Sequence, residues 1–192
     1  MHSFDHYFAT VKLTLDKMDR KSLDKAFKAI DGCDTVYLMG NGGSAAVADH
    51  WVCDYMKGIN EDVRFAPVAR AISLVSNGPL VTALANDLGY ETVFSKQLEY
   101  YRCGYGDVAI AVSSSGNSKN VVNGLMRAKG LGASTIALTG FTGGEAAKVA
   151  DISIHVPSDN YGVVEDCHMM VLHAVSQMIR YRDAKDLDNL KL

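Results

Sequence analysis

The chain lacks the features that mark several classes of protein. It has 19 Lys and Arg against 22 Asp and Glu, a formal net charge of -3, so it offers no basic excess for a nucleic-acid backbone or an anionic membrane. No apolar run approaches the ~18 residues of a transmembrane helix. The opening segment MHSFDHYFATVKLTLD is acidic in places and has no apolar stretch before a small-residue cleavage site, unlike a signal peptide. These absences predict a cytoplasmic protein.

Cysteine is also scarce. Cys33, Cys53, Cys103 and Cys167 lie far apart and form no C-x-x-C pair, which indicates neither a zinc knuckle nor a disulfide framework. A chain of 192 residues buries roughly two thirds to three quarters of its unfolded surface, so it folds without such supports. Repeats, low-complexity tracts and interdomain linkers are absent from the sequence. We therefore expect a single domain over residues 1–192.

What the sequence does contain is an alternation of short apolar, β-branched runs with helix-length segments. The runs are 34–40, 69–74, 106–115, 134–140 and 150–157. The intervening or following helical segments are 44–57, 78–86, 91–103, 118–130 and 163–181. Continuous apolar strands that alternate with helices predict an α/β fold: a doubly wound, mostly parallel five-stranded sheet with helices on both faces.

An N-terminal helical segment, about residues 1–30, precedes the first strand. Apolar side chains recur there mostly three to five residues apart, which is typical of an amphipathic helix. The pattern breaks near 19–21, and Ser22 is a candidate N-cap for a second helix. Because this apolar face lies outside the α/β unit, it predicts an oligomer.

The loop after the first strand, Gly40-Asn41-Gly42-Gly43-Ser44-Ala45, satisfies G-x-G-x-x-A. A dinucleotide site also needs an acidic residue at the end of the second strand, where the chain has Leu74-Val75-Ser76-Asn77. A Walker A loop needs G-K-[ST], which does not follow. The glycines alone are equally typical of tight packing between a strand and a helix.

The loop after the third strand, Ser113-Ser114-Ser115-Gly116-Asn117-Ser118, is more specific. It brings hydroxyls and free backbone amides to a predicted helix N-terminus, an arrangement that suits a phosphate monoester without Lys or Arg. The alternative is an ordinary serine-rich loop with Ser118 as N-cap. Both loops lie at the carboxyl ends of predicted parallel strands, where open α/β sheets bind ligands, and this favours the phosphate site.

His50 and Asp54 are a candidate metal pair. They are four residues apart on a predicted helix, so their side chains project from the same face and can hold one ion. Such a pair is also common as a surface hydrogen bond. The residues alone leave both interpretations open.

Five segments, in this order, resemble the sugar isomerase (SIS) domain family, and within it the bacterial phosphoheptose isomerases. They are GNGGSAAVADHWVCD, ANDLGYETVFSKQ, GDVAIAVSSSGNSKNVV, ALTGFTGGEAAKVADISIHVP and EDCHMMVLHAVSQMI. The resemblance covers nearly the whole chain. It implies a flavodoxin-like SIS fold and a homotetramer.

The resemblance also implies roles for particular residues. Those expected to bind substrate are Asn41, Gly42, Gly43, Ser44, Asn86, Asp87, Ser113, Ser114, Ser115, Ser118 and Glu165. For Asp87 a capping role is the alternative. The ligands expected to hold Zn²⁺ are His50, Asp54, Glu165 and His173. The family usually has Glu in place of Asp54 and Gln in place of Glu165. His168, five residues before His173, is expected to pack in the core or to support a ligand.

The function that the resemblance implies is an aldose–ketose isomerase that converts sedoheptulose 7-phosphate to D-glycero-D-manno-heptose 7-phosphate through an enediol. Asp54 or Glu165 is the expected base, and His173 is expected to return or relay a proton. One alternative is a noncatalytic SIS module that senses phosphosugars or binds proteins. Another is an isomerase of a different phosphosugar, which the departures at positions 54 and 165 keep open.

Overall fold

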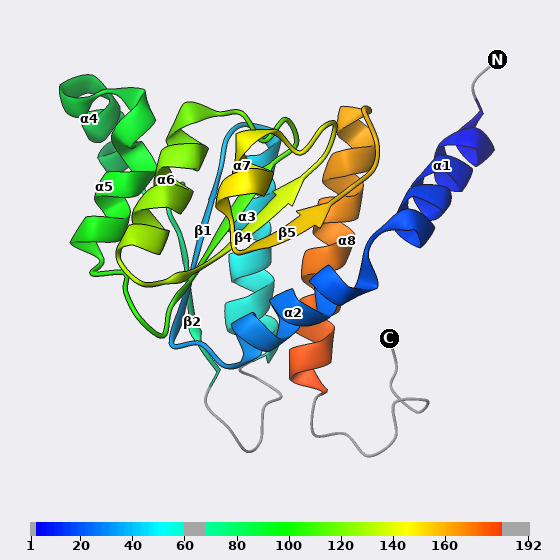
Figure 1. Ribbon diagram of the computed structural model, residues 1–192, viewed down its shortest axis with the longest axis horizontal. Helices are drawn as coiled ribbons and strands as arrows, with labels where there is room; N and C mark the ends of the chain where they lie inside the picture. The colour runs from blue at the N-terminus through cyan, green and yellow to red at the C-terminus, as the bar shows by residue number, and fades with distance from the viewer. Residues whose placement is uncertain (1–2, 60–67, 182–192) are drawn as a thin grey trace.

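The computed structural model describes residues 3–59 and 68–181, which form one open α/β arrangement (Figure 1). Five strands make a sheet in the order β2-β1-β3-β4-β5, and every neighbouring pair is parallel. The strands are β1 (Thr35–Gly40), β2 (Arg70–Ser73), β3 (Val108–Ser113), β4 (Ser134–Thr139) and β5 (Ile152–His155). Every residue of β1 and β3 is buried, as expected for central strands covered on both faces. The predicted fold class is confirmed.

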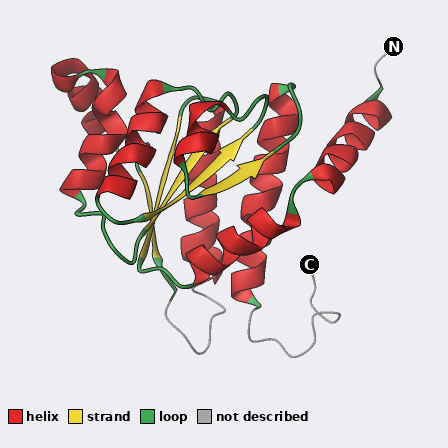
Figure 2. Cartoon of the chain, in the orientation of Figure 1, coloured by secondary structure: helices red, strands yellow, loops and turns green. Residues whose placement is uncertain are grey.

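Helices cover both faces of the sheet (Figure 2). They are α1 (Phe4–Lys17), α2 (Arg20–Asp31), α3 (Gly43–Cys53), α4 (Gly78–Leu88), α5 (Val93–Tyr100), α6 (Lys119–Gly130), α7 (Gly144–Val149) and α8 (Tyr161–Arg180). One core cluster joins α2, α3 and α8 to the sheet, and a second joins α4, α5, α6 and α7 to the opposite face. None of the helices in the described ranges is both long and apolar enough to cross a bilayer.

The structure corrects several local expectations. The N-cap of α2 is Asp19, which accepts a hydrogen bond from the Lys21 amide, whereas the Ser22 hydroxyl donates to the Asp19 carboxylate. The helix expected over 44–57 ends at Cys53 and continues as a π-helical turn, η1 (Asp54–Ile59). A 3₁₀ turn, η2 (Tyr90–Thr92), precedes α5. Helix α7 was not expected, because six residues are too few to display helical periodicity.

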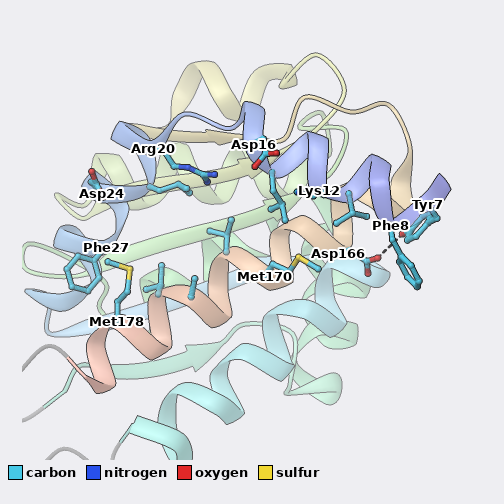
Figure 3. A pocket seen from close by; sticks show the side chains of 16 residues that line it. Tyr7, Phe8, Lys12, Asp16, Arg20, Asp24, Phe27, Asp166, Met170 and Met178 are labelled. Atoms are coloured by element: carbon cyan, nitrogen blue, oxygen red, sulfur yellow. Dashed lines mark hydrogen bonds between the residues drawn. The ribbon is translucent and has the colours of Figure 1, made fainter. Parts of the chain in front are cut away.

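Helix α1 projects beyond the sheet (Figure 1), and an apolar groove lies between α1, α2 and α8 (Figure 3). The groove has a volume of about 690 Å³. The Tyr7 hydroxyl donates a 2.7 Å hydrogen bond to Asp166 and so ties α1 to α8. Two rings on α1 remain largely in solvent, with Phe4 83% and Phe8 64% exposed. An apolar surface of this kind on a single chain is typical of a protein interface.

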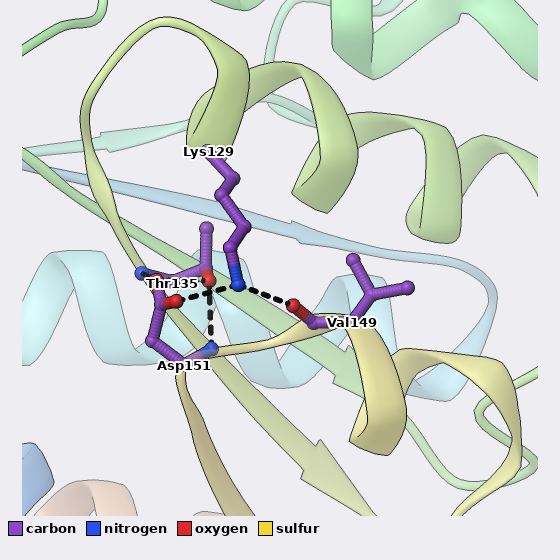
Figure 4. A network of polar contacts seen from close by, with 4 residues as sticks. All are labelled: Lys129, Thr135, Val149 and Asp151. Carbon is purple, nitrogen blue, oxygen red and sulfur yellow. Dashed lines mark hydrogen bonds and ion pairs between the residues drawn. The ribbon is translucent and has the colours of Figure 1, made fainter.

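A polar network joins the ends of α6, β4 and β5 (Figure 4). The Lys129 ammonium lies 2.7 Å from an Asp151 oxygen and also donates to the carbonyl of Val149. The other Asp151 oxygen accepts from the amide and the hydroxyl of Thr135, and that hydroxyl accepts from the Asp151 amide. Partial burial raises the pKa of Asp151, but the hydrogen bonds from Lys129 and Thr135 outweigh burial and lower it below its usual range.

Asp151→Asn is expected to lower the free energy of unfolding near pH 7 by about 1–2 kcal/mol, a value discounted because the side chain is partly exposed. The wild-type contribution is present above the unfolded-state pKa, near 4, and is lost as the pH falls through the lower folded-state pKa. Urea unfolding of wild type and variant at pH 7 and at pH 3 measures the difference in unfolding free energy and its dependence on pH. A difference between wild type and variant that stays constant from pH 7 to pH 3 would contradict this account.

Candidate functional site

The first element of the site is the loop that joins β1 to α3. Gly42 is the N-cap of α3 and has a φ of +55°, a conformation that favours glycine. A Cβ atom added at Gly43 would lie 2.7 Å from an oxygen of Glu165, so glycine allows the loop and α8 to approach each other closely. Gly42 therefore serves the backbone conformation of the loop, and Gly43 allows its close approach to Glu165.

The serine-rich loop between β3 and α6 forms the second element. Ser113 Oγ accepts a hydrogen bond from the Gly116 amide, and Ser115 Oγ accepts one from the Asn117 amide. Ser118 occupies the N-cap position of α6 but makes no side-chain capping bond. The buried hydroxyl of Ser114 has no partner among the described residues. Ser114 and Ser118 are thus available to a ligand. Ser113 and Ser115, which only accept here, keep their hydroxyl hydrogens to donate. Capping does not account for Ser118.

These two loops enclose a pocket of about 280 Å³ with the N-terminal part of α8. Its lining contains eight of the predicted substrate residues: Asn41, Gly43, Ser44, Ser113, Ser114, Ser115, Ser118 and Glu165. Val112 and Tyr161 complete the described lining, which includes neither Lys nor Arg. An anion bound here would depend on hydroxyls and backbone amides.

Asn86 and Asp87 do not line this pocket. They lie near the end of α4, where the Asn86 amide donates a 2.8 Å hydrogen bond to Asp87, and both are exposed. Helix α4 packs against η2 and α5, on the face of the sheet opposite α8. Their proposed contact with substrate stays a prediction.

A cluster of three predicted metal ligands lies between α3, η1 and α8. His50 Nε2 lies 3.1 Å from His173 Nε2 and 3.2 Å from Asp54 Oδ2, and the distance from His173 Nε2 to Asp54 Oδ2 is 2.8 Å. Ligand atoms in a tetrahedral zinc site at ~2.0–2.1 Å from the ion are ~3.3 Å apart. Two imidazole nitrogens and a carboxylate oxygen at these separations fit Zn²⁺ with a fourth position open.

A buried hydrogen bond sets the helix register that forms this cluster. The indole N–H of Trp51 donates to the carbonyl of Leu172 over 2.7 Å, and both residues are fully buried. Each is the sequence neighbour of a metal-ligand candidate, His50 on α3 and His173 on α8. The contact between Trp51 and α8 therefore fixes the position of one histidine relative to the other.

The fourth predicted ligand, Glu165, does not join the three-residue cluster in the structure. It lies eight residues before His173 on α8, a rise of about 12 Å. Its carboxylate instead lies beside Gly43 in the pocket formed by the two loops. This position fits the substrate role predicted for Glu165, and its role as a fourth zinc ligand stays a prediction.

His168 is fully buried, in agreement with the expected packing role. Its ring nitrogens have no hydrogen-bond partner that satisfies normal geometry among the described residues, and none with the three clustered ligands. Burial lowers the pKa of His168 to about 4; the Thr139 backbone opposes this decrease in part, and the nearby His155 adds a smaller decrease. The imidazole is therefore neutral at pH 7.

Sequence reasoning missed three residues around the pocket. Tyr161 lines it from the first turn of α8. Asn120 and Tyr90 hydrogen-bond to Asn41 from α6 and η2. Asn120 and Tyr90 belong to no sequence motif that would reveal their role. Each acts through a hydrogen bond with Asn41, which is distant from both in the sequence.

Comparisons with known proteins place the chain in one family. One SIS domain model matches residues 6–140 and a second matches 100–182. A phosphoheptose isomerase of Aquifex aeolicus is 40% identical over 151 residues, covering 79% of this chain and 77% of that protein. The structure of phosphoheptose isomerase GmhA from Neisseria gonorrhoeae superposes with a TM-score of 0.81 at 31% identity, over 90% of this chain and 94% of that one. A phosphoheptose isomerase from Francisella tularensis gives 0.82 at 28% identity, over 94% and 99%.

Proposed function

The chain belongs to the SIS domain family, and we propose that it is an aldose–ketose isomerase that converts sedoheptulose 7-phosphate to D-glycero-D-manno-heptose 7-phosphate. The observation that carries the proposal is the convergence of His50, Asp54 and His173 on one point next to α8, in a chain whose hydroxyl-lined pocket adjoins the same helix. A module that only binds phosphosugars needs the pocket but has no use for the three-residue cluster.

The serine-rich loop is proposed to hold the phosphate. The N-terminus of α6 carries about half a unit of positive charge and several unpaired amides, and Ser118, whose hydroxyl makes no capping bond, lies at that end. Binding energy from the phosphate, remote from the reacting carbons, then orients the sugar chain along the pocket. Asn41 and Glu165 line the same pocket and are proposed to contact the sugar.

Proton transfer is proposed to use a carboxylate and His173. Asp54 or Glu165 removes a proton from C1 of the ketose, and the C2 carbonyl oxygen takes a proton from His173 Nε2, which gives the enediol. Return of a proton to C2 and loss of the O1 proton complete the aldose. Asp54 Oδ2 lies 2.8 Å from His173 Nε2, so this carboxylate and the imidazole can exchange a proton directly.

His50, Asp54 and His173 are the residues that would hold a zinc ion, with one position left for a further ligand. When bound, zinc supplies Lewis-acid polarisation of the sugar carbonyl and hydroxyl oxygens. Because His173 Nε2 would give its lone pair to zinc, that atom would carry no proton in the zinc-loaded site, so the proton relay through His173 belongs to the metal-free site. In the zinc-loaded site the Asp54 or Glu165 carboxylate is proposed to move the proton from C1 to C2, while solvent takes the proton of O1 and supplies that of O2.

An NMR time course with sedoheptulose 7-phosphate, run with and without added zinc, tests the proposal directly. Hexose phosphates in parallel samples serve as competing substrates. We expect the resonances of the heptose 7-phosphate to appear as those of the ketose decline. Binding without turnover of any sugar would favour the sensing module, and turnover of a hexose phosphate in preference would favour the isomerase of another phosphosugar.

Ser115→Ala and Ser118→Ala are expected to weaken substrate binding more than folding. Each removes a hydroxyl from the proposed phosphate site, with a loss of about 0.5–3 kcal/mol in binding that depends on the charge of the acceptor. Substrate titrations give KM, and thermal melting gives stability. Ser95→Ala is a matched control, because Ser95 lies on α5, donates to the Thr92 carbonyl of η2 and is not in the described pocket lining. An unchanged KM in both pocket variants would count against the phosphate site.

The chain is also proposed to form a homotetramer through the groove between α1, α2 and α8. Phe8 lines this groove and the exposed Phe4 ring stacks against the Phe8 ring, so burial against another chain would remove both rings from water. Light scattering is expected to give four times the 20.7 kDa chain mass. Phe8→Glu should shift the mass towards smaller species, whereas Tyr105→Glu, a fully exposed ring elsewhere, should not. A stable monomer at micromolar concentration would overturn the proposal.

A further inference from the structure

Two asparagines form a reciprocal amide pair between the two loops of the site. Asn41 Nδ2 donates to Asn120 Oδ1, and Asn120 Nδ2 donates to Asn41 Oδ1, each over 2.9 Å. Asn41 belongs to the loop after β1, whereas Asn120 lies in the first turn of α6 and is 2% exposed. The Tyr90 hydroxyl donates a further 2.8 Å bond to Asn41 Oδ1 from η2. Three separate elements therefore meet at one side chain of the pocket.

The backbone fixes which way both amides face. The Val121 N–H, which can only donate, makes a 3.0 Å hydrogen bond to one atom of the Asn120 amide, so that atom must be Oδ1. Asn120 Nδ2 then faces Asn41 and requires an acceptor there, which is Asn41 Oδ1. Exchanging oxygen and nitrogen in either amide would place two donors or two acceptors opposite each other. The first turn of α6 thus determines the orientation of Asn41.

This orientation limits what Asn41 can do for a ligand. Its Oδ1 already accepts from Asn120 and Tyr90, which uses both lone pairs, and its Nδ2 has given one hydrogen to Asn120. One N–H remains, on a half-buried residue that lines the pocket with Ser118 and Glu165. Asn41 can therefore donate to a ligand oxygen but has no lone pair left to accept from a hydroxyl.

We propose that Asn120 is a positioning residue that holds Asn41 as a hydrogen-bond donor to an oxygen of the bound sugar phosphate. The inference rests on the proposed function and adds a residue that touches no substrate itself. Because the pair joins the first loop to the helix behind the serine-rich loop, it also fixes the distance between the two parts of the pocket. Tyr90 supports the same orientation from the third element.

The test is Asn120→Asp. An aspartate keeps an oxygen for the Val121 N–H but presents its second oxygen to Asn41 Oδ1, and this opposition turns the Asn41 amide or displaces it. We expect KM for sedoheptulose 7-phosphate to rise at least about tenfold, while kcat changes less than about threefold, because the proton-transfer groups are untouched. Asn123→Asp is the matched control: it introduces the same charge on the same helix, at a residue bonded to the Glu91 carbonyl and not to Asn41.

A double variant distinguishes positioning from a general structural effect. If Asn120 acts through Asn41, Asn120→Asp adds little to KM once Asn41 has been replaced by Ala, and the two effects are far from additive. Additive effects, or a KM equal to wild type in Asn120→Asp, would overturn the inference. If thermal melting shows that Asn120→Asp does not fold, Tyr90→Phe tests the orientation of Asn41 instead. Tyr90 is exposed, and this variant removes the hydroxyl that donates to Asn41 Oδ1. It is expected to raise KM about two- to fivefold, and no change would overturn the inference.

The wild-type enzyme separates this inference from the function on which it rests. If wild type neither binds nor converts sedoheptulose 7-phosphate, the proposed function fails and the inference fails with it. If wild type converts the sugar and the Asn120 variants behave as wild type does, the inference alone fails.

Discussion

Asp54→Asn is expected to lower kcat/KM for sedoheptulose 7-phosphate by about 10²–10⁴, the usual contribution of one acid or base. The reason is its position: Asp54 Oδ2 lies within hydrogen-bond distance of both His50 and His173, whereas Glu165 lies beside Gly43 in the sugar pocket. Glu165→Gln is therefore expected to raise KM with a smaller change in kcat. Single-turnover assays at saturating zinc measure the chemical step separately from metal loss.

Asp49→Asn is the matched control for this experiment. Asp49 lies on α3 one residue before His50, but its carboxylate accepts hydrogen bonds from Ser73 at the end of β2 and from Ser76 beyond it, and it does not belong to the three-residue cluster. We expect near wild-type turnover from that variant. If Glu165→Gln loses activity a hundredfold and Asp54→Asn retains it, the base is Glu165 and the proposed assignment is reversed.

The parts of the fold and site that depend on local pattern could be predicted from sequence. The central strands are continuous apolar runs, and the spacing of His50 and Asp54 places them on one helix face by geometry alone. The contribution of His173 came from family resemblance, since no local rule connects residues more than a hundred positions apart. Its contact with His50 depends on how α3 packs against α8 through Trp51.

Other features depend on tertiary geometry and could not be predicted from local pattern. Glu165 and His173 share a helix eight residues apart, and no local pattern indicates that the Glu165 carboxylate lies beside Gly43 in the loop pocket. The pairing of Asn41 with Asn120 joins residues 79 positions apart. The sequence alone shows Asn120 only as a polar residue near the start of a predicted helix. Its role depends on the loop after β1, which brings Asn41 opposite it in the fold.

Removal of metal is expected to have the other large effect. If His50, Asp54 and His173 hold one ion, exhaustive chelation should abolish most isomerase activity, and stoichiometric zinc should restore it. The ligands come from α3, η1 and α8, so the ion also links these elements, and the apo protein should melt at a lower temperature than the zinc-loaded one. Elemental analysis of the purified protein gives the metal content per chain.

Variants of single ligands refine the metal experiment. His50→Ala or His173→Ala leaves two of the three clustered ligands and should lower zinc affinity strongly. Glu165→Gln should leave the zinc affinity nearly unchanged if the three clustered residues are the only protein ligands. The affinity should fall if Glu165 becomes the fourth ligand when zinc binds. These affinities are measured by competition with a zinc indicator, which requires no catalytic activity.

Asp54→Glu gives the last and most informative variant, because it lengthens the carboxylate by one methylene within the cluster and installs the residue usual in the family. Faster isomerisation would mean that the shorter side chain is a suboptimal base, and slower isomerisation would mean that the spacing of 2.8–3.2 Å around Asp54 is matched to aspartate. The metal hypothesis fails if active enzyme contains no divalent ion and keeps full activity after exhaustive chelation. His173 and the Asp54 carboxylate would then act as an acid and base pair that exchanges a proton across their direct contact.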